Sequence, residues 1–314
     1  MKKFLMVVVT GLLIVSMVAC GGTPASSSSE EDSGAAGKKV SLLTPYLSSV
    51  TTNQMVEQMK ESMEAEGMVV TVVDTKGDFA QLASRIEDTV SSKADAIVLV
   101  SADPSQVTTQ LQSAFDANIP VFGCDSGFIE GMMVNATSDN YAMGELITKY
   151  LFEDLMGGKG TVIALTHRPH PGVAKRCIAL DDMFKKYPDI KLITEQHVEV
   201  PGPIENSRKI MENLILSNSS KDSITAVWCA WDEPAIGVTQ ALQDASRGEV
   251  IVVGVDGNSQ AVEMINQDTN LKATVAQNFE GMTGIVVTEM IKMFAGEEIT
   301  KGEQYAPATI ITKE

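Results

Sequence analysis

Polar and aromatic side chains follow short apolar runs at several points along the chain. They include Tyr46, Ser49, Asp125, His167, Trp231, Asp256 and Gln277. Carboxylates accept hydrogen bonds from pairs of neighbouring hydroxyl groups, amides donate and accept them, and an aromatic ring can cover the apolar C–H face of a sugar ring. These residue types favour recognition of a small polyhydroxylated ligand over a reaction centre.

The same segments lack the motifs of nucleotide binding and of hydrolysis. The sequence contains no GxGxxG or GxxxxGK[ST] loop to cradle phosphates and no GxSxG nucleophile elbow. His167 and His170 are close in sequence, but no carboxylate or cysteine is spaced to complete a metal site with them. We therefore expect no enzyme activity, no cofactor and no metal. A secreted α/β hydrolase is the rival interpretation, which an activity assay would test.

The charge of the chain limits its partners. Its formal net charge is −17, so it would repel the phosphates of nucleic acids and of anionic lipids. From residue 38 onward no apolar stretch approaches the length of a membrane-spanning helix. We expect a monomer that binds a small molecule, does not bind nucleic acid, and contacts the membrane only through its N-terminus.

Strand and helix patterns alternate along the chain after residue 38. Apolar, β-branched runs predict strands at residues 40–43, 68–73, 96–100, 119–123, 132–134, 161–165, 191–197, 224–229, 250–255 and 273–276. Helical stretches are predicted at residues 53–66, 79–91, 105–117, 140–155, 173–186, 204–216, 233–245 and 280–294. Most of the strand runs are continuously apolar, as expected in a parallel sheet that is buried on both faces.

This alternation predicts an α/β fold of doubly wound parallel sheets with right-handed crossovers. A segment of about 275 residues exceeds one comfortable hydrophobic core, so we predict two α/β lobes. Ligands of such sheets bind beyond the carboxyl ends of the strands. The side chains named above follow those ends, which makes them the candidate site.

The N-terminus has the pattern of a bacterial lipoprotein signal. Lys2 and Lys3 precede an apolar run over residues 4–18, which is short for a membrane span and is typical of a signal peptide. Residues 17–20 resemble a lipobox, although Met17 and Val18 depart from its usual residues. We predict a signal peptide over residues 1–19, lipidation of Cys20 and an extracytoplasmic protein anchored to the cell membrane. A plain secretory signal is the alternative.

Two further features concern the segment after Cys20 and the other cysteines. Residues 21–34 have almost no apolar side chains and cannot offset the entropy of ordering, so residues 20–37 are predicted to be a disordered tether. Cys124, Cys177 and Cys229 form no CxxC pattern. Whether any two of them form a disulfide stays open.

Six segments follow one another in order along residues 39–313, namely residues 94–100, 118–122, 138–144, 232–237, 252–257 and 273–277. Taken together, they resemble the ribose-binding-protein group of periplasmic sugar-binding proteins. The resemblance implies two lobes that close over the ligand, joined by three chain crossings. It places residues 38–139 and 278–306 in the N-terminal lobe, and residues 140–277 and 307–314 in the C-terminal lobe.

The resemblance also assigns roles to individual residues. It matches Asp125, Arg176, Asp256 and Gln277 to ligand-binding positions of the family. The chain departs from the family at Ser126, where an arginine is common, and at Trp231, where an asparagine is usual. Ser49, Thr51 and Thr52 replace an asparagine and an aromatic pair. These departures imply a ligand of a different shape from ribose, with Trp231 supplying the stacking.

The implied function is that of a solute-binding lipoprotein, which captures a monosaccharide or sugar alcohol and delivers it to the permease subunits of an ABC importer. The alternative function is that of a ligand-sensing receptor for a chemotaxis or sensor-kinase system, which would use the same binding chemistry. A non-sugar polyol is the alternative ligand.

Several residues have plain structural alternatives. Asp256 and Asp232 could each cap a helix, Trp228 is expected in the core, and an arginine in a helix such as Arg176 is usually solvated. On this basis, replacing Arg176 or Asp256 with alanine should abolish ligand binding and leave the melting point of the unliganded protein nearly unchanged.

Overall fold

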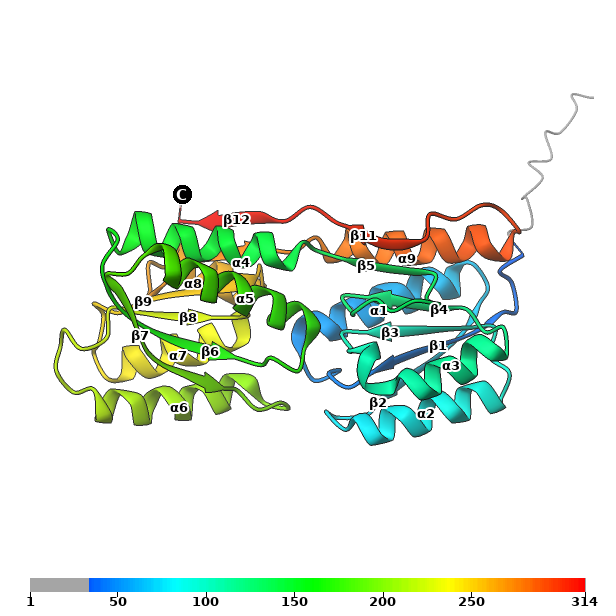
Figure 1. Ribbon diagram of the computed structural model, residues 1–314, viewed down its shortest axis with the longest axis horizontal. Coiled ribbons are helices and arrows are strands. Elements are labelled where there is room, and N and C mark those ends of the chain that lie inside the picture. The colour runs from blue at the N-terminus through cyan, green and yellow to red at the C-terminus, as the bar shows by residue number, and fades with distance from the viewer. Residues whose placement is uncertain (1–33, 314) are drawn as a thin grey trace, which may run out of the picture. The chain divides into compact units, whose positions relative to one another are not determined.

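The computed structural model describes residues 34–313, which contain two six-stranded sheets flanked by helices (Figure 1). The first sheet has the strand order β11-β5-β4-β3-β1-β2, and all of its paired strands run parallel. Its strands are β1 (Lys39–Thr44), β2 (Val69–Asp74), β3 (Ala96–Val100), β4 (Val121–Cys124), β5 (Val134–Thr137) and β11 (Gly302–Tyr305).

The second sheet has the order β12-β10-β9-β8-β6-β7 and is parallel except for the antiparallel pair of β10 and β12. Its strands are β6 (Gly160–Thr166), β7 (Ile190–His197), β8 (Ala226–Cys229), β9 (Ile251–Asp256), β10 (Leu271–Ala276) and β12 (Thr309–Thr312). Two parallel-dominated sheets covered by helices confirm the predicted fold class.

Helices cover both faces of each sheet. On the first sheet they are α1 (Val50–Ala65), α2 (Phe79–Ser91), α3 (Thr108–Asp116) and α9 (Phe279–Phe294), with a 3₁₀ turn over Pro104–Val107. On the second they are α4 (Asn140–Lys149), α5 (Pro171–Lys186), α6 (Pro203–Ser217), α7 (Asp232–Asp244) and α8 (Ser259–Asn266), with a π-type turn over Tyr150–Leu155. We call each sheet with its helices a lobe.

The packing explains why the strand sequences are continuously apolar. In the first lobe, Leu42 and Val98 pack in one core with α1 and α9, while the neighbouring Leu43 and Ile97 pack in a second core with α2 and α3. Successive side chains of a strand point to opposite faces of the sheet, so a sheet with helices on both faces needs apolar residues at every position.

The chain passes between the two lobes three times, from β5 to α4, from β10 to α9 and from β11 to β12. The predicted lobe boundaries at residues 139, 277 and 306 lie within these three connections. Since the parallel strands of each lobe end at the edge from which these connections leave, the strand-end side chains of both lobes meet near the crossings.

Three elements were not predicted from the sequence. The strand β11 alternates half-buried and exposed positions at a sheet edge, and β12 is a short edge strand. The helix α8 is short and begins directly after Asn258. None of them has the continuous apolar run or the length that reveals a buried element. The predicted helix over residues 105–117 is divided into the 3₁₀ turn and α3.

The folded part begins earlier than predicted. Ala35 is buried in the core beside α1, and the amide of Gly37 donates to the carbonyl of Gly67, so residues 34–37 belong to the first lobe and not to the tether. The signal peptide, Cys20 and the rest of the tether lie outside the described residues. Cys124, Cys177 and Cys229 are buried free thiols. Within residues 34–313, no helix has the length and apolar character needed to cross a bilayer.

Candidate functional site

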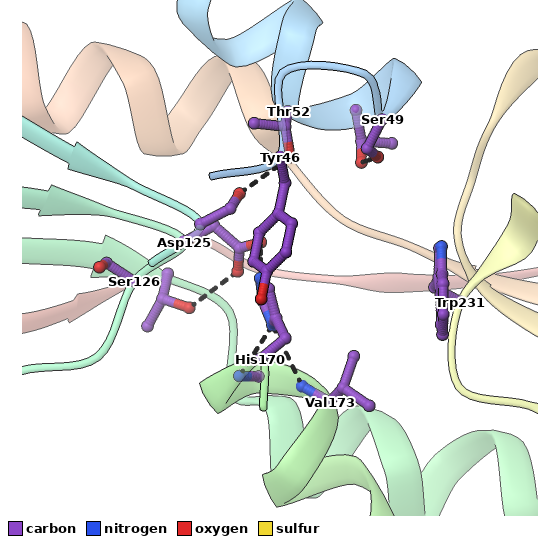
Figure 2. A network of polar contacts seen from close by, with 12 residues as sticks. Tyr46, Ser49, Thr52, Asp125, Ser126, His170, Val173 and Trp231 are labelled. Carbon is purple, nitrogen blue, oxygen red and sulfur yellow. Dashed lines mark hydrogen bonds and ion pairs between the residues drawn. The ribbon is translucent and has the colours of Figure 1, made fainter. Parts of the chain in front are cut away.

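A cavity lies between the lobes, beyond the carboxyl ends of the strands of both sheets (Figure 2). It contains about 480 Å³ of space free of protein atoms, part of it open to solvent, a size suited to a small molecule. The first lobe lines it with Tyr46, Ser49, Thr51, Thr52, Ser101 and Asp125. The second lobe lines it with His167, His170, Val173, Arg176, Val200, Trp231, Glu233 and Asp256.

Arg176 is the centre of a buried polar cluster on one side of the cavity. Its Nε donates to Asn140 Oδ1 at 2.8 Å, and its Nη1 donates to the Ala230 carbonyl at 2.8 Å and to Asp256 Oδ1 at 3.3 Å. Gln277 Nε2 donates to the same Asp256 oxygen at 2.8 Å. Asn140 and Gln277 adjoin two of the chain crossings, so this cluster ties the site to the hinge.

Asp125 faces this cluster from the first lobe. Burial raises its pKa to about 7, an effect that Arg176 opposes and Asp256 increases. The Thr137 hydroxyl donates to Asp125 Oδ1 at 3.4 Å, and Nε2 of His170 lies 3.7 Å from Oδ2. The site therefore places two buried carboxylates around one guanidinium, each with capacity left to accept hydrogen bonds from hydroxyl groups.

The backbone at both aspartates is unusual. Asp125 has φ of +49°, in the left-handed region, and Asp256 has φ of +134°, a conformation that is essentially restricted to glycine. Non-glycine residues hold such conformations only where the surrounding structure imposes them. The backbone at these two strand ends is thus locally strained, and this conformation orients the two carboxylates. Such strain is common at ligand sites.

Aromatic rings from both lobes form another part of the wall. His167 Nδ1 lies 3.0 Å from the Val198 carbonyl, which can only accept, so Nδ1 carries the proton. Nε2 of His167 then accepts from the Tyr46 hydroxyl at 3.2 Å, across the cleft. Trp231 packs edge-on against His167 with ring centroids 6.2 Å apart. In Figure 2, Trp231 faces the group formed by Tyr46, Asp125 and His170.

His170 has a structural role at the start of α5. Its Nδ1 accepts from the amides of Gly172 and Val173 at 3.1 and 3.3 Å, which caps the helix and leaves the proton on Nε2, toward Asp125. Burial, with Arg176 adding to it, lowers the pKa of His170 to about 3, so the ring is neutral. Among residues 34–313, no group of three or more His, Cys, Asp or Glu side chains could hold a metal ion.

The structure places all but one of the predicted ligand residues on the cavity wall, namely Tyr46, Ser49, Asp125, His167, Arg176, Trp231 and Asp256. Gln277 is not on the wall and lies behind Asp256. Sequence reasoning missed Ser101, His170, Val173, Val200 and Glu233 as lining residues. Ser101 directly follows β3, and Val173 and Glu233 lie in the first turns of α5 and α7. All three lie between a strand end and the end of the first turn of the next helix, and this position is the sequence signal that identifies them.

The structure shows which of the purely structural roles suggested by the sequence apply to Asp256, Asp232 and Trp228. Asp256 does not cap α8, because Asn258 does so by accepting from Gln260. Asp232 begins α7 without capping it and accepts from the Asn258 amide and the Thr274 hydroxyl, each at 2.8 Å. Trp228 is fully buried in the core, as expected.

The positions at which the chain departs from the family pattern also differ in placement. Ser49, Thr51, Thr52 and Trp231 line the cavity. Ser126 does not, because its hydroxyl donates to the Ala102 carbonyl inside the first lobe. The position where an arginine is common is thus turned away from the site.

Stability should depend on pH through Asp125. Because burial raises its pKa from an ordinary value of 3.8 to about 7, the folded protein holds a proton there in this interval and the unfolded chain does not. The free energy of unfolding of the wild type, relative to Asp125→Asn, should therefore increase as pH falls from about 8 to about 5 and decrease as pH rises through 7.

Urea unfolding of both proteins at several pH values measures this difference. Comparing the two isolates Asp125 from His167 and His170, whose lowered pKa values act in the opposite direction. A stability difference that does not change with pH would contradict the assignment.

The chain is similar in sequence and in fold to known proteins. The sequence model of the periplasmic binding protein domain matches residues 40–298. The ribose import binding protein of Bacillus subtilis (strain 168) is 28% identical over 276 residues, which cover 86% of this chain and 85% of that protein. An ABC sugar transporter subunit from Rhodobacter sphaeroides 2.4.1 has a similar structure, with a TM-score of 0.83 and 27% identity over 88% of this chain and 99% of that one. An ABC transporter solute binding protein from Agrobacterium vitis, solved with bound allitol, has a TM-score of 0.82 and 26% identity over 88% and 96% of the two chains.

Proposed function

The chain belongs to the periplasmic binding protein domain family, and we therefore propose that it captures a monosaccharide or sugar alcohol between its lobes and delivers it to the permease subunits of an ABC importer. Members of this family are extracytoplasmic solute-binding proteins of sugar transporters, and the chain is a binding protein and not an enzyme. What we propose beyond family membership is the class of ligand, the residues that contact it and the importer that receives it.

One observation carries it: carboxylates, a guanidinium and aromatic rings from both lobes line a single cavity. Asp125 and Asp256 would accept from ligand hydroxyls, Arg176 would donate to a ring or hydroxyl oxygen, and Trp231 would cover an apolar C–H face. The names of two relatives agree with this chemistry, since one is a ribose import protein and the other was solved with allitol.

Gln277 has a supporting part in this proposal. Its Nε2 orients Asp256, and its Oε1 is buried without a hydrogen-bond partner among the described residues. A buried acceptor that lacks a partner costs free energy unless a ligand or a water molecule satisfies it. We propose that Gln277 orders the carboxylate that grips the ligand, from behind the cavity wall.

Ligand capture would follow from a shift between open and closed arrangements of the lobes. A ligand that touches Asp125 on one lobe and Arg176, Trp231 and Asp256 on the other binds the closed arrangement better and so favours it. Hydrogen bonds to charged groups contribute about 1.5–3 kcal/mol each, so three or four reach the roughly −8 kcal/mol of a micromolar complex after ordering costs.

The test is isothermal titration calorimetry of pentoses, hexoses, pentitols, hexitols and inositols, with a thermal-shift screen to select candidates. We expect one class to bind with micromolar affinity and to raise the melting temperature, with no turnover of the compound. If no sugar or polyol of the panel binds, the proposed function is wrong.

We also propose that lipidated Cys20 anchors the protein to the membrane. The support is the sequence pattern of residues 1–20 alone, since these residues lie outside the described part of the chain. Cell fractionation should find the wild type with membranes, and Cys20→Ser released from them or retained as an unprocessed precursor without lipid.

A further inference from the structure

The first turn of helix α1 lacks a cap of its own. Its N-cap residue, Ser49, makes no side-chain hydrogen bond to the amides of the helix, and the first turn contains no acidic residue. The amides at a helix N-terminus need acceptors, and the helix dipole favours negative charge there. Helix α2 of the same lobe differs, because its own Asp78 accepts from the Gln81 amide.

The missing acceptor comes from the other lobe. Glu233, in the first turn of α7, accepts from the Ser49 hydroxyl at 2.8 Å through Oε2, and its Oε1 lies 3.5 Å from the Val50 amide. Trp231 Nε1 also donates to Oε2, at 3.3 Å, and holds the carboxylate in place. A carboxylate of the second lobe therefore lies beside the first free amide of α1, at the positive end of the helix dipole, and supplies the acceptor that the helix itself lacks.

The surroundings of Glu233 make this contact dependent on closure. The residue is only 4% exposed, and no lysine or arginine within residues 34–313 forms an ion pair with it. A buried carboxylate without a counter-ion needs hydrogen-bond donors. Of its three donors, Ser49 and Val50 belong to the opposite lobe, so both are lost when the lobes separate.

We infer that Glu233 is a positioning residue that closes the cleft by capping α1 across it, independently of the ligand. With Tyr46 and His167 it joins the lobes by direct protein contacts on the cavity wall. The ligand is then held by Asp125, Arg176 and Asp256, and Glu233 adds to affinity through the closed arrangement instead of through contact. This inference rests on the proposed binding function only where affinity is concerned.

The first experiment uses the full chain without ligand. Amide hydrogen exchange of the first turn of α1 should be faster in Glu233→Ala than in the wild type, while exchange at the start of α2, which has its own cap, should stay the same. Glu205→Ala is the matched control, since Glu205 is an exposed glutamate in the first turn of α6. Equal exchange at α1 in Glu233→Ala and wild type would overturn the inference.

The second experiment uses ribose and allitol as probes. Glu233→Ala should bind about tenfold more weakly, mainly through faster dissociation. Ser49→Ala should weaken binding as well, and the double variant should be no weaker than Glu233→Ala, because both changes break one contact. Additive effects would show that Glu233 acts on the ligand and would overturn the inference. If neither probe binds the wild type, ribose and allitol are excluded as ligands, and the exchange experiment still tests the cap.

Discussion

Replacing Arg176 with alanine is expected to lower the free energy of unfolding by about 3–5 kcal/mol, because it leaves a buried ionic cluster without the one cation that residues 34–313 supply to it. The side chain is 2% exposed and donates to Asn140, Ala230 and Asp256. Without it, Asp125 and Asp256 would remain buried with no opposite charge nearby. The same variant should lose measurable binding of sugars or polyols, since the closed site could no longer form.

Urea unfolding and calorimetry measure the two effects. Arg168→Ala is the matched control, because Arg168 lies in the same lobe and pairs with Glu195 at the surface, with 41% of its side chain exposed. Exposed ion pairs contribute about 0–1 kcal/mol, so this control should change stability little and binding not at all. If Arg176→Ala unfolded at the same urea concentration as Arg168→Ala, the cluster would not be a source of stability.

This expected instability differs from what the sequence predicts. An arginine in a helix is usually solvated, and the sequence therefore suggests that its loss leaves the melting point nearly unchanged. The structure shows Arg176 on the buried face of α5, together with Val173, Cys177 and Leu180. Their spacing of three and four residues contains this information, because residues at such intervals share one face of a helix.

The two-lobed α/β fold could be predicted because most central strands carry a continuous apolar run. That run exists for a physical reason, since helices cover both faces of each sheet. The edge strands β11 and β12 escaped prediction because a strand at an edge has less to bury. The burial of Ala35 was not predicted, because one small apolar residue in a polar segment gives no recognisable pattern. Its burial nevertheless marks the start of the folded part of the chain.

The strand-end rule located the candidate site but not the contacts across it. Tyr46, Asp125 and Asp256 follow strands, and the topology of parallel sheets brings such positions to one edge. The contact of Glu233 with Ser49 joins residues 184 positions apart and exists only between lobes. No local sequence pattern indicates which two side chains meet across a closing cleft, so this contact could be identified only from the three-dimensional structure.

Asp256→Asn should separate binding from stability. We expect ligand affinity to fall about 100-fold, since the variant loses the charged acceptor for ligand hydroxyls. We expect the free energy of unfolding to fall by less than about 2 kcal/mol, well below the loss for Arg176→Ala. Arg176 and Gln277 both donate to Asp256 Oδ1, and an asparagine that places its carbonyl oxygen there keeps both bonds.

The asymmetry between the two variants follows from the balance of charge in the cluster. Burial raises the pKa of Asp256, so its charge is costly in the folded protein. When Asp256 is neutral, one of the effects that raise the pKa of Asp125 is removed, and Asp125 can then ionise as the counter-charge of Arg176. Neutralising one of the two carboxylates is therefore tolerated, whereas removing the guanidinium, the one cation of this cluster within residues 34–313, is not. Calorimetry and urea unfolding of Asp256→Asn, beside Asp181→Asn as a half-exposed carboxylate control, decide the matter. Full affinity in Asp256→Asn would place the ligand elsewhere, and a stability loss equal to that of Arg176→Ala would refute the proposed charge balance.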